Sequence, residues 1–244
     1  QNIGRTLLEI HKDYCDFIDH SRQLSCFTVA KNIQEVQVEQ IEVKILEIKS
    51  YKAQAIDSRQ EEEANQLFHM QCMLNAMKSS LQMWIALKHE DYLPAWRYLI
   101  DGQEYINVAL QISDYEGVRN LEDFFICVEK SIFPNQNVYL SPGFSETIGK
   151  CSICLRNFSL CEHLEHRVYM GKLCYRFDRK IIDSDHVAFV ENPKDRRCII
   201  TEISNESGKM INRFTREICG ERRSDIEGHQ VGGFALSNHS LDFL

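Results

Sequence analysis

The first half of the chain places apolar residues at the spacing of an α-helix. From Leu67 onward, successive apolar positions are separated by three and four residues in turn. This spacing puts their side chains on one stripe of a helix and is typical of a helix bundle or a coiled-coil seam. The stripe consists of Leu67, Met70, Leu74, Met77, Leu81 and Trp84.

The segment 32–55 carries apolar residues on two opposite faces. As a helix, it should have partners on both sides. The same residues also alternate as in a β-strand, so a strand stays open as an interpretation. The Glu, Gln and Lys content and a length above about 20 residues favour the helix. One face holds Val38, Ile41, Ile45 and Ile48, and the other holds Val36, Val43 and Leu46.

Further helices are predicted at 3–20, 92–112 and 118–131. Pro94 fits the first turn of its helix, where the missing N–H would have no intrahelical partner. Only three of the eleven glycines precede residue 136, and prolines interrupt the helical pattern from residue 134 onward. We therefore predict an α+β protein, with a helical bundle over 1–135 followed by a zinc-stabilised β-rich domain over 136–244.

The second part of the chain consists of short apolar runs separated by turn residues. These runs predict short strands. We also expect a short helix over 209–218, and the polar tail 224–244 should form either a mobile arm or a final hairpin. The predicted strands are NVYLSPGF, HRVYMG, KLCYRF, DHVAFVEN and RCIITEI.

Charge, hydropathy and cysteine content indicate in which compartment the protein is expected and what it is expected to bind. The net charge of −8 comes from the first 135 residues, with 13 Lys and Arg against 21 Asp and Glu. An acidic half of this kind repels phosphate, so nucleic-acid binding is disfavoured. No apolar run approaches the roughly 20 residues of a membrane span, and the N-terminal residues are unlike a signal peptide. Ten mostly scattered cysteines fit a reducing compartment. We predict a soluble cytoplasmic protein, trimmed or processed because it begins at Gln1.

Four residues within a short stretch have the spacing of a metal site. Cys151 and Cys154 form C-x2-C, and Cys161 and His163 form C-x-H six residues later. Thiolates and imidazoles are the ligands of tetrahedral zinc, and three cysteines with one histidine close its coordination shell. We therefore predict a structural zinc ion without Lewis-acid catalysis. As fourth ligand, His163 is preferred, although His166 or Cys174 could replace it.

This stretch resembles a known kind of segment. CSICLRNFSLCEHLEHRVYMG is similar to a compact zinc segment with the pattern C-S-I-C-x6-C-x-H-x5-Y-x-G in uncharacterised proteins of bacteria, phages and mobile elements. Some of those proteins also carry a stretch that resembles HVAFVENPKDRRCIIT. The resemblance covers about 50 of the 244 residues. It implies zinc at the same four positions and a bacterial or phage-related setting, but no reaction. Position 166 holds His where the pattern has Gly.

Candidate interaction residues lie beyond the metal stretch. The positive charges most suited to phosphate or to an acidic partner are Arg196, Arg197, Arg222 and Arg223. Apolar anchors for a protein partner would be Tyr169, Tyr175 or Phe189. Asp185–His186 suggests a nuclease-like pair, but an ordinary strand histidine is the preferred interpretation.

These features favour a non-enzymatic zinc-binding adaptor in a larger bacterial or phage-related assembly. We expect the helices to bind a protein partner, a further copy of the chain, or both. The alternative is a nucleic-acid-associated component of an antiviral defence or mobile-element system. An enzyme with an unfamiliar site around Asp185 and His186 is the third interpretation.

Overall fold

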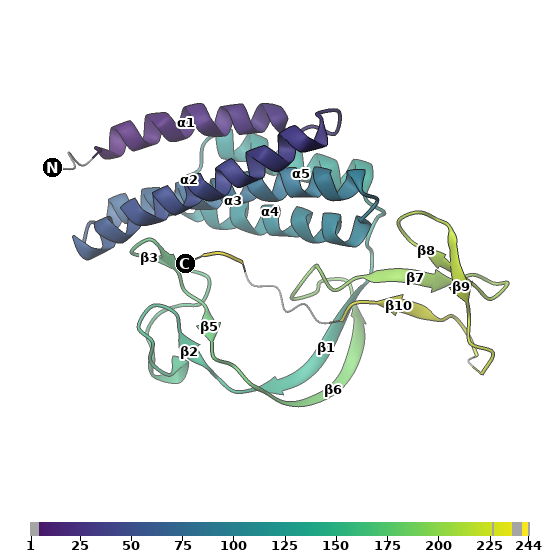
Figure 1. The fold of residues 1–244 in the computed structure, drawn as a ribbon. Coiled ribbons are helices and arrows are strands. Elements are labelled where there is room, and N and C mark those ends of the chain that lie inside the picture. Colours follow the sequence, from purple (N-terminus) through teal and green to yellow (C-terminus); the bar gives the residue numbers. More distant parts are fainter. Residues whose placement is uncertain (1–4, 226, 236–240, 244) are drawn as a thin grey trace. The chain divides into compact units, whose positions relative to one another are not determined.

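The computed structural model describes residues 5–225, 227–235 and 241–243, and in this part most helices precede the strands (Figure 1). This arrangement confirms the predicted α+β class. No helix in the described ranges combines the length and the apolar character needed to cross a membrane. The helices are α1 (Leu7–Leu24), α2 (Lys31–Asp57), α3 (Glu61–Lys88), α4 (Tyr92–Ile112) and α5 (Glu116–Ile132).

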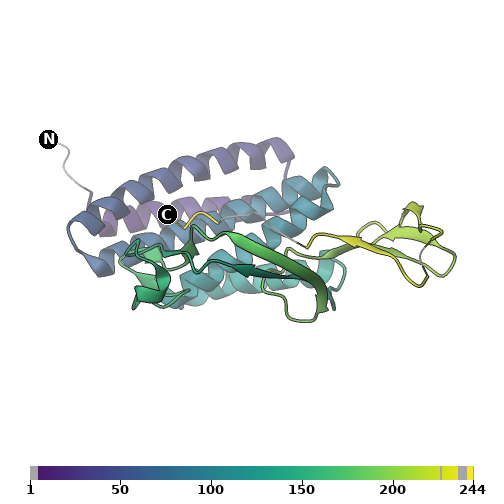
Figure 2. The same cartoon turned by 90° about the horizontal axis from the view of Figure 1, so that it is seen from below.

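Helix α3 is the centre of the helical part, and it packs against both α2 and α4. The predicted stripe from Leu67 to Trp84 is buried, and so are most residues between its members. Figures 1 and 2 show the helices running alongside one another. Because neighbours surround α3, polar residues such as Gln71 and Asn75 are also completely buried. The core of the helical part therefore contains polar groups that need hydrogen-bond partners.

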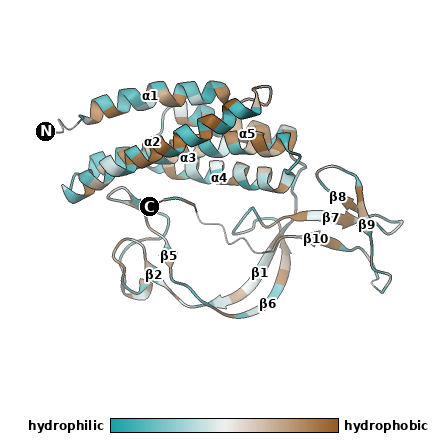
Figure 3. Cartoon of the chain, in the orientation of Figure 1, coloured by the Kyte–Doolittle hydropathy of each residue, from teal (hydrophilic) through white to brown (hydrophobic). Residues whose placement is uncertain are grey.

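Helix α2 confirms the helical interpretation of 32–55, but helices of this chain cover only one of its two apolar faces. Ile41, Ile45 and Ile48 are buried, whereas Val43 and Leu46 on the opposite face are exposed. Figure 3 shows the resulting alternation of hydrophobic and hydrophilic bands along this helix. A partner on the second face would have to come from outside the described part of the chain.

Helix α1 begins four residues later than predicted because Thr6 caps it. The Thr6 hydroxyl accepts a hydrogen bond from the backbone N–H of Glu9, and the Glu9 carboxylate accepts from the backbone N–H of Thr6. This reciprocal arrangement is a capping box, which satisfies two backbone donors at a helix start.

The strands form one sheet and several two-stranded ribbons. β1 pairs with β6 in a long antiparallel ribbon, and β7 to β10 form a sheet in the order β10-β7-β8-β9. The strands are β1 (Tyr139–Glu146), β2 (Lys150–Cys151), β3 (Val168–Tyr169), β4 (Lys172–Leu173), β5 (Arg176–Phe177), β6 (Ile181–Val190), β7 (Ile200–Ser204), β8 (Lys209–Asn212), β9 (Ile218–Glu221) and β10 (Val231–Gly233).

Two predictions for the C-terminal part need correction. The helix expected over 209–218 is wrong, because β8 and β9 pair across a turn in which the Asn212 side chain accepts hydrogen bonds from the backbone N–H groups of Phe214 and Thr215. In the described part of the tail, β10 pairs with β7, so no hairpin within the tail is seen there. Part of the tail, residues 236–240, lies outside the described residues.

The contacts divide the chain into two units. One contains residues 1–126, 148–178 and 241–244, and the other contains residues 127–147 and 179–240. This division differs from the predicted boundary between residues 135 and 136, because the segment with the cysteine pairs belongs to the helical unit. The second unit has a small apolar core of its own, formed by Leu140, Cys198 and Ile200 with Val138, Val231 and Ala235 packed against it.

Candidate metal centre

Two tight turns bring the four predicted ligands together. The first follows β2, where the backbone N–H of Leu155 donates to the carbonyl of Cys151 and Leu155 adopts a left-handed conformation with φ 60°. Such a turn directs Cys151 and Cys154 to the same side. The second follows the short 3-10 helix Phe158–Leu160 and presents Cys161 and His163.

The four ligand atoms all lie within 4.8 Å of one another. The Sγ atoms of Cys154 and Cys161 are 3.5 Å apart, and Cys161 Sγ is 3.2 Å from His163 Nδ1. Ligands at about 2.3 Å from a tetrahedral zinc ion are separated by about 3.8 Å. This group of Cys151, Cys154, Cys161 and His163 could therefore hold a metal ion.

Backbone N–H groups point at the sulfur atoms, as a cluster of thiolates requires. The N–H of Ile153 donates to Cys151 Sγ, and the N–H of His163 donates to Cys161 Sγ at 3.2 Å. Burial alone would raise the pKa of Cys151, but hydrogen bonds from backbone N–H groups of Cys154 and Ile153 and from nearby thiols outweigh it and lower the pKa to about 7. This cysteine is therefore prepared to bind a cation as the thiolate.

The choice among the three candidate fourth ligands falls on His163. His166 is not part of this group; its side chain is exposed and its backbone is in the left-handed conformation, with φ 66°. Cys174 Sγ lies 3.8 Å from Cys151 Sγ and is buried. Burial raises the pKa of Cys174, and this cysteine does not belong to the group of four residues whose ligand atoms all lie within 4.8 Å of one another.

Tyr169, one of the three predicted anchors, packs against the candidate histidine ligand. Its ring packs edge-on against His163, with ring centroids 4.8 Å apart, and its hydroxyl accepts a hydrogen bond from the backbone N–H of Leu164. Of the other two predicted anchors, Tyr175 is half-buried and Phe189 is exposed in β6. Phe189 is thus the most accessible of the three.

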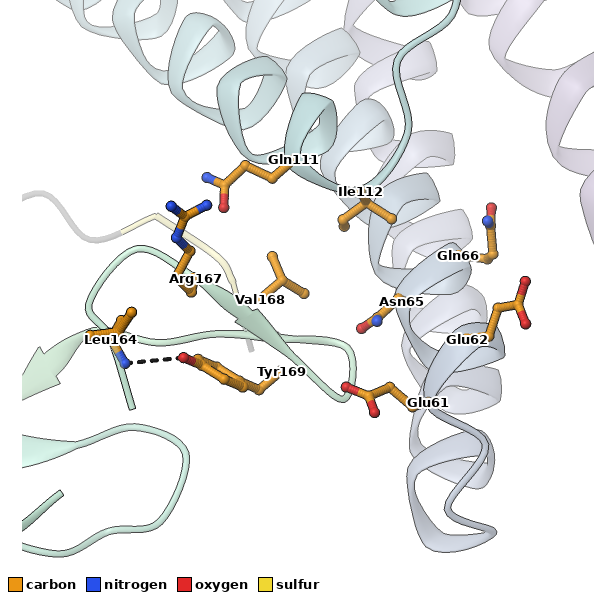
Figure 4. A pocket seen from close by; sticks show the side chains of 10 residues that line it. All are labelled: Glu61, Glu62, Asn65, Gln66, Gln111, Ile112, Leu164, Arg167, Val168 and Tyr169. Atoms are coloured by element: carbon orange, nitrogen blue, oxygen red, sulfur yellow. Dashed lines mark hydrogen bonds between the residues drawn. The ribbon is translucent and has the colours of Figure 1, made fainter. Parts of the chain in front are cut away.

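The β3–β4 hairpin fastens this centre to helix α3. The N–H of Gly171 donates to Asn65 Oδ1 at 2.7 Å, and the N–H of Met170 donates to the Glu61 carboxylate at 3.4 Å. Beside the hairpin lies an open cleft of about 970 Å³, whose walls come from α3, the end of α4 and residues 164–169 (Figure 4). Glu61 on α3 and Arg167 just before β3 both line the cleft, so it carries charged groups of both signs.

The structure places the four predicted arginines in the second unit, and each is engaged. Arg196 pairs with Glu129, and the buried Arg197 pairs with Asp195 at 3.0 Å. Arg223 pairs with Asp225 at 2.8 Å, while Arg222 donates to the carbonyl of Gly228. Each of these four arginines therefore has at least one partner within the chain.

His186 lies in strand β6, as preferred from the sequence. Its ring nitrogen Nδ1 is 3.1 Å from the carboxylate of Asp185, and both side chains are largely exposed. The ring also packs over Gly143 on the paired strand β1, where a Cβ atom would lie 2.5 Å from it. The glycine therefore provides room for an ordinary surface histidine.

A polar site in the helical unit was not predicted from the sequence. Gln71, Asn75 and Tyr105 bind residue 242, as described below. A signal was present, because Gln71 and Asn75 stand four residues apart, directly beside members of the apolar stripe from Leu67 to Trp84. Comparison of the chain with protein families, curated proteins and solved structures found no match.

Proposed function

We propose that this chain is a non-enzymatic zinc-binding adaptor that binds a partner protein through the exposed face of α2. The observation that supports the proposal is a row of large apolar side chains on this face. We call it the outer row of α2, and its exposed fractions lie between 46% and 69%. The outer row consists of Ile33, Val36, Val43 and Leu46.

The outer row consists of two apolar pairs on α2, Ile33 with Val36 and Val43 with Leu46, with the exposed Glu39 and Gln40 between them. Single exposed apolar residues are common on protein surfaces, whereas contiguous apolar patches mark interaction sites. Val36 and Val43 are one heptad apart, and Ile33 and Leu46 extend the row in both directions. A second helix laid along α2 could place its own apolar residues over this row.

The charges beside the outer row suggest the chemistry of the partner. Glu35, Glu39 and Glu42 are exposed along the same helix, and Glu35 has Lys31 as an ion-pair partner at 3.7 Å. Two copies of this face would bring carboxylates together, and like charges across an interface are unfavourable. The proposed partner is therefore a cationic amphipathic helix of another protein.

Zinc in this proposal has a structural role. The candidate centre offers three thiolates and one imidazole, which fill a tetrahedral shell and leave no position for substrate or water. Zinc binding supplies folding free energy of order 10 kcal/mol in zinc-finger peptides. It would thereby keep residues 148–178 folded on the helical unit.

The test uses the full chain and a labelled 21-residue amphipathic helix of Leu and Lys as a probe. We expect fluorescence anisotropy to show binding, and a Val43→Asp/Leu46→Asp variant to weaken it at least tenfold. Leu8→Asp serves as control, because this residue is also a largely exposed apolar residue but lies on α1. Probe binding that the double variant leaves unchanged, or the absence of binding, would contradict the proposal.

Light scattering separates the two kinds of partner. A monomeric wild-type chain agrees with a partner of different sequence. A wild-type dimer that the Val43→Asp/Leu46→Asp variant converts to a monomer would instead make α2 a self-association surface and overturn the cationic partner.

A further inference from the structure

Residues 241–243 occupy a polar slot between helices α2, α3 and α4 of the helical unit. The backbone of Asp242 is bound at both of its hydrogen-bonding groups. Its N–H donates to the hydroxyl of Tyr105 at 2.7 Å. Its carbonyl accepts from Gln71 Nε2 at 3.1 Å and from Asn75 Nδ2 at 3.4 Å.

With residues 241–243 in place, the polar side chains of the slot are buried, and a neighbouring lysine orients one of them. Gln71 and Asn75 are fully buried, and Tyr105 is 5% exposed. Lys52 Nζ donates to Gln71 Oε1 at 2.7 Å, which turns the amide nitrogen of Gln71 toward residue 242. Buried amide donors without acceptors are costly, so the slot requires a carbonyl at this position.

One polar atom of the slot lacks a hydrogen-bond partner among the described residues. It is the buried Oδ1 atom of Asn75. A peptide that adds one more N–H donor beside it would satisfy this oxygen. The slot therefore has the capacity to bind a ligand better than the segment it holds.

Two contacts add side-chain selectivity to the backbone contacts. The carboxylate of Asp242 pairs with Lys49 on α2. The ring of Phe243 packs edge-on against Tyr105 and Phe68, with centroid distances of 5.2 Å and 6.4 Å. The slot therefore favours peptides in which an acidic residue is followed by an aromatic residue.

We propose that this slot is a peptide-binding site for short segments with an aspartate followed by a phenylalanine, and that residues 241–243 are its built-in, displaceable occupant. Displacement is feasible because the contacts involve only a few residues and mostly backbone groups, which any extended peptide also carries. A peptide supplied by another chain competes with the built-in segment for the same donors and the same aromatic face. The slot and the outer row of α2 share no residues, so this inference goes beyond the proposed function.

The experiment measures binding of a fluorescein-labelled peptide with the sequence of residues 239–244, HSLDFL, to the full chain. In an Asp242→Lys/Phe243→Ala variant the built-in segment no longer fits, so more of the protein is competent to bind. We expect the peptide to bind this variant at least about tenfold more tightly than the wild type. In the wild type the tail occupies the slot, and the apparent affinity falls with the fraction of molecules whose slot is free. Phe189→Ala, a phenylalanine substitution outside the slot, should bind the peptide like the wild type.

Peptide variants keep the test independent of protein folding. A peptide in which the phenylalanine is replaced by alanine should bind the Asp242→Lys/Phe243→Ala variant at least tenfold more weakly. Asn75→Leu added to that variant should abolish binding while the melting transition is retained. The proposal is overturned if the released variant binds no tighter than the wild type, or if the alanine peptide binds equally well.

Discussion

Lys52 is a buried ammonium group within the helical unit. Only 4% of the residue is exposed, and its Nζ atom lies 4.7 Å from the centre of the Phe68 ring while donating to Gln71. Burial lowers the pKa of Lys52 to about 8 from its ordinary value of 10.5. The folded protein therefore releases this proton at a lower pH than the unfolded chain does.

This shift predicts a pH dependence of stability with a definite sign. Below pH 8 the lysine is charged in both states, and the full cost of burying the charge opposes folding. Between pH 8 and pH 10.5 the folded state has lost the proton and the unfolded state has kept it, so stability rises with pH. From pH 7.5 to 9.5 Lys52 should add about 2 kcal/mol to the free energy of unfolding.

Urea unfolding at the two pH values checks this contribution. Between pH 7.5 and 9.5, the free energy of unfolding of the wild type should rise by about 2 kcal/mol more than that of Lys52→Met. Lys12→Met, which removes an exposed lysine of α1, should change with pH as the wild type does. Equal pH responses of wild type and Lys52→Met would show that the lysine is not buried in its charged form.

At the scale of elements, the β3–β4 hairpin depends on one glycine. Gly171 has φ +68°, and a Cβ atom at this residue would lie 2.7 Å from the carbonyl oxygen of Ala64 on α3. Gly171→Ala therefore combines backbone strain with a clash against a helix. Gly208 has φ +76° with open space around it, so Gly208→Ala carries the strain without the clash.

We expect thermal unfolding to separate these two effects. Left-handed strain costs about 1 kcal/mol, and a clash with backbone adds about 1–3 kcal/mol. Gly171→Ala should lower the melting temperature distinctly more than Gly208→Ala. If both variants melt alike, the hairpin is not held against α3 as described.

Some elements could be predicted from the sequence, and others depend on contacts between distant residues. The helices and the four candidate ligands follow from local spacing, which is visible along the chain. Residues 209–218 were predicted as a helix because nothing local reveals the pairing of β8 with β9. The placement of the hairpin on α3 rests on the bond between Gly171 and Asn65, 106 residues apart, and no local pattern indicates it.

At the scale of the whole molecule, the chain crosses between its two units several times. Residues 148–178 lie in the sequence between two segments of the second unit, but they are part of the helical unit. They contain the candidate metal centre. This segment contains only short strands and few buried apolar residues, so it lacks a hydrophobic core of its own. A metal ion bound by four residues within it would replace that core.

Native mass spectrometry of the intact protein tests the zinc-binding account most directly. We expect one zinc ion per chain in the wild type and none in Cys154→Ser, which removes a ligand. Cys127→Ser removes an exposed cysteine outside the centre and should keep the zinc. Removal of the metal by a chelator should also lower the melting temperature if zinc has the proposed role of stabilising residues 148–178. A metal-free protein with full stability, or a Cys154→Ser variant that keeps its zinc and its melting temperature, would contradict the account.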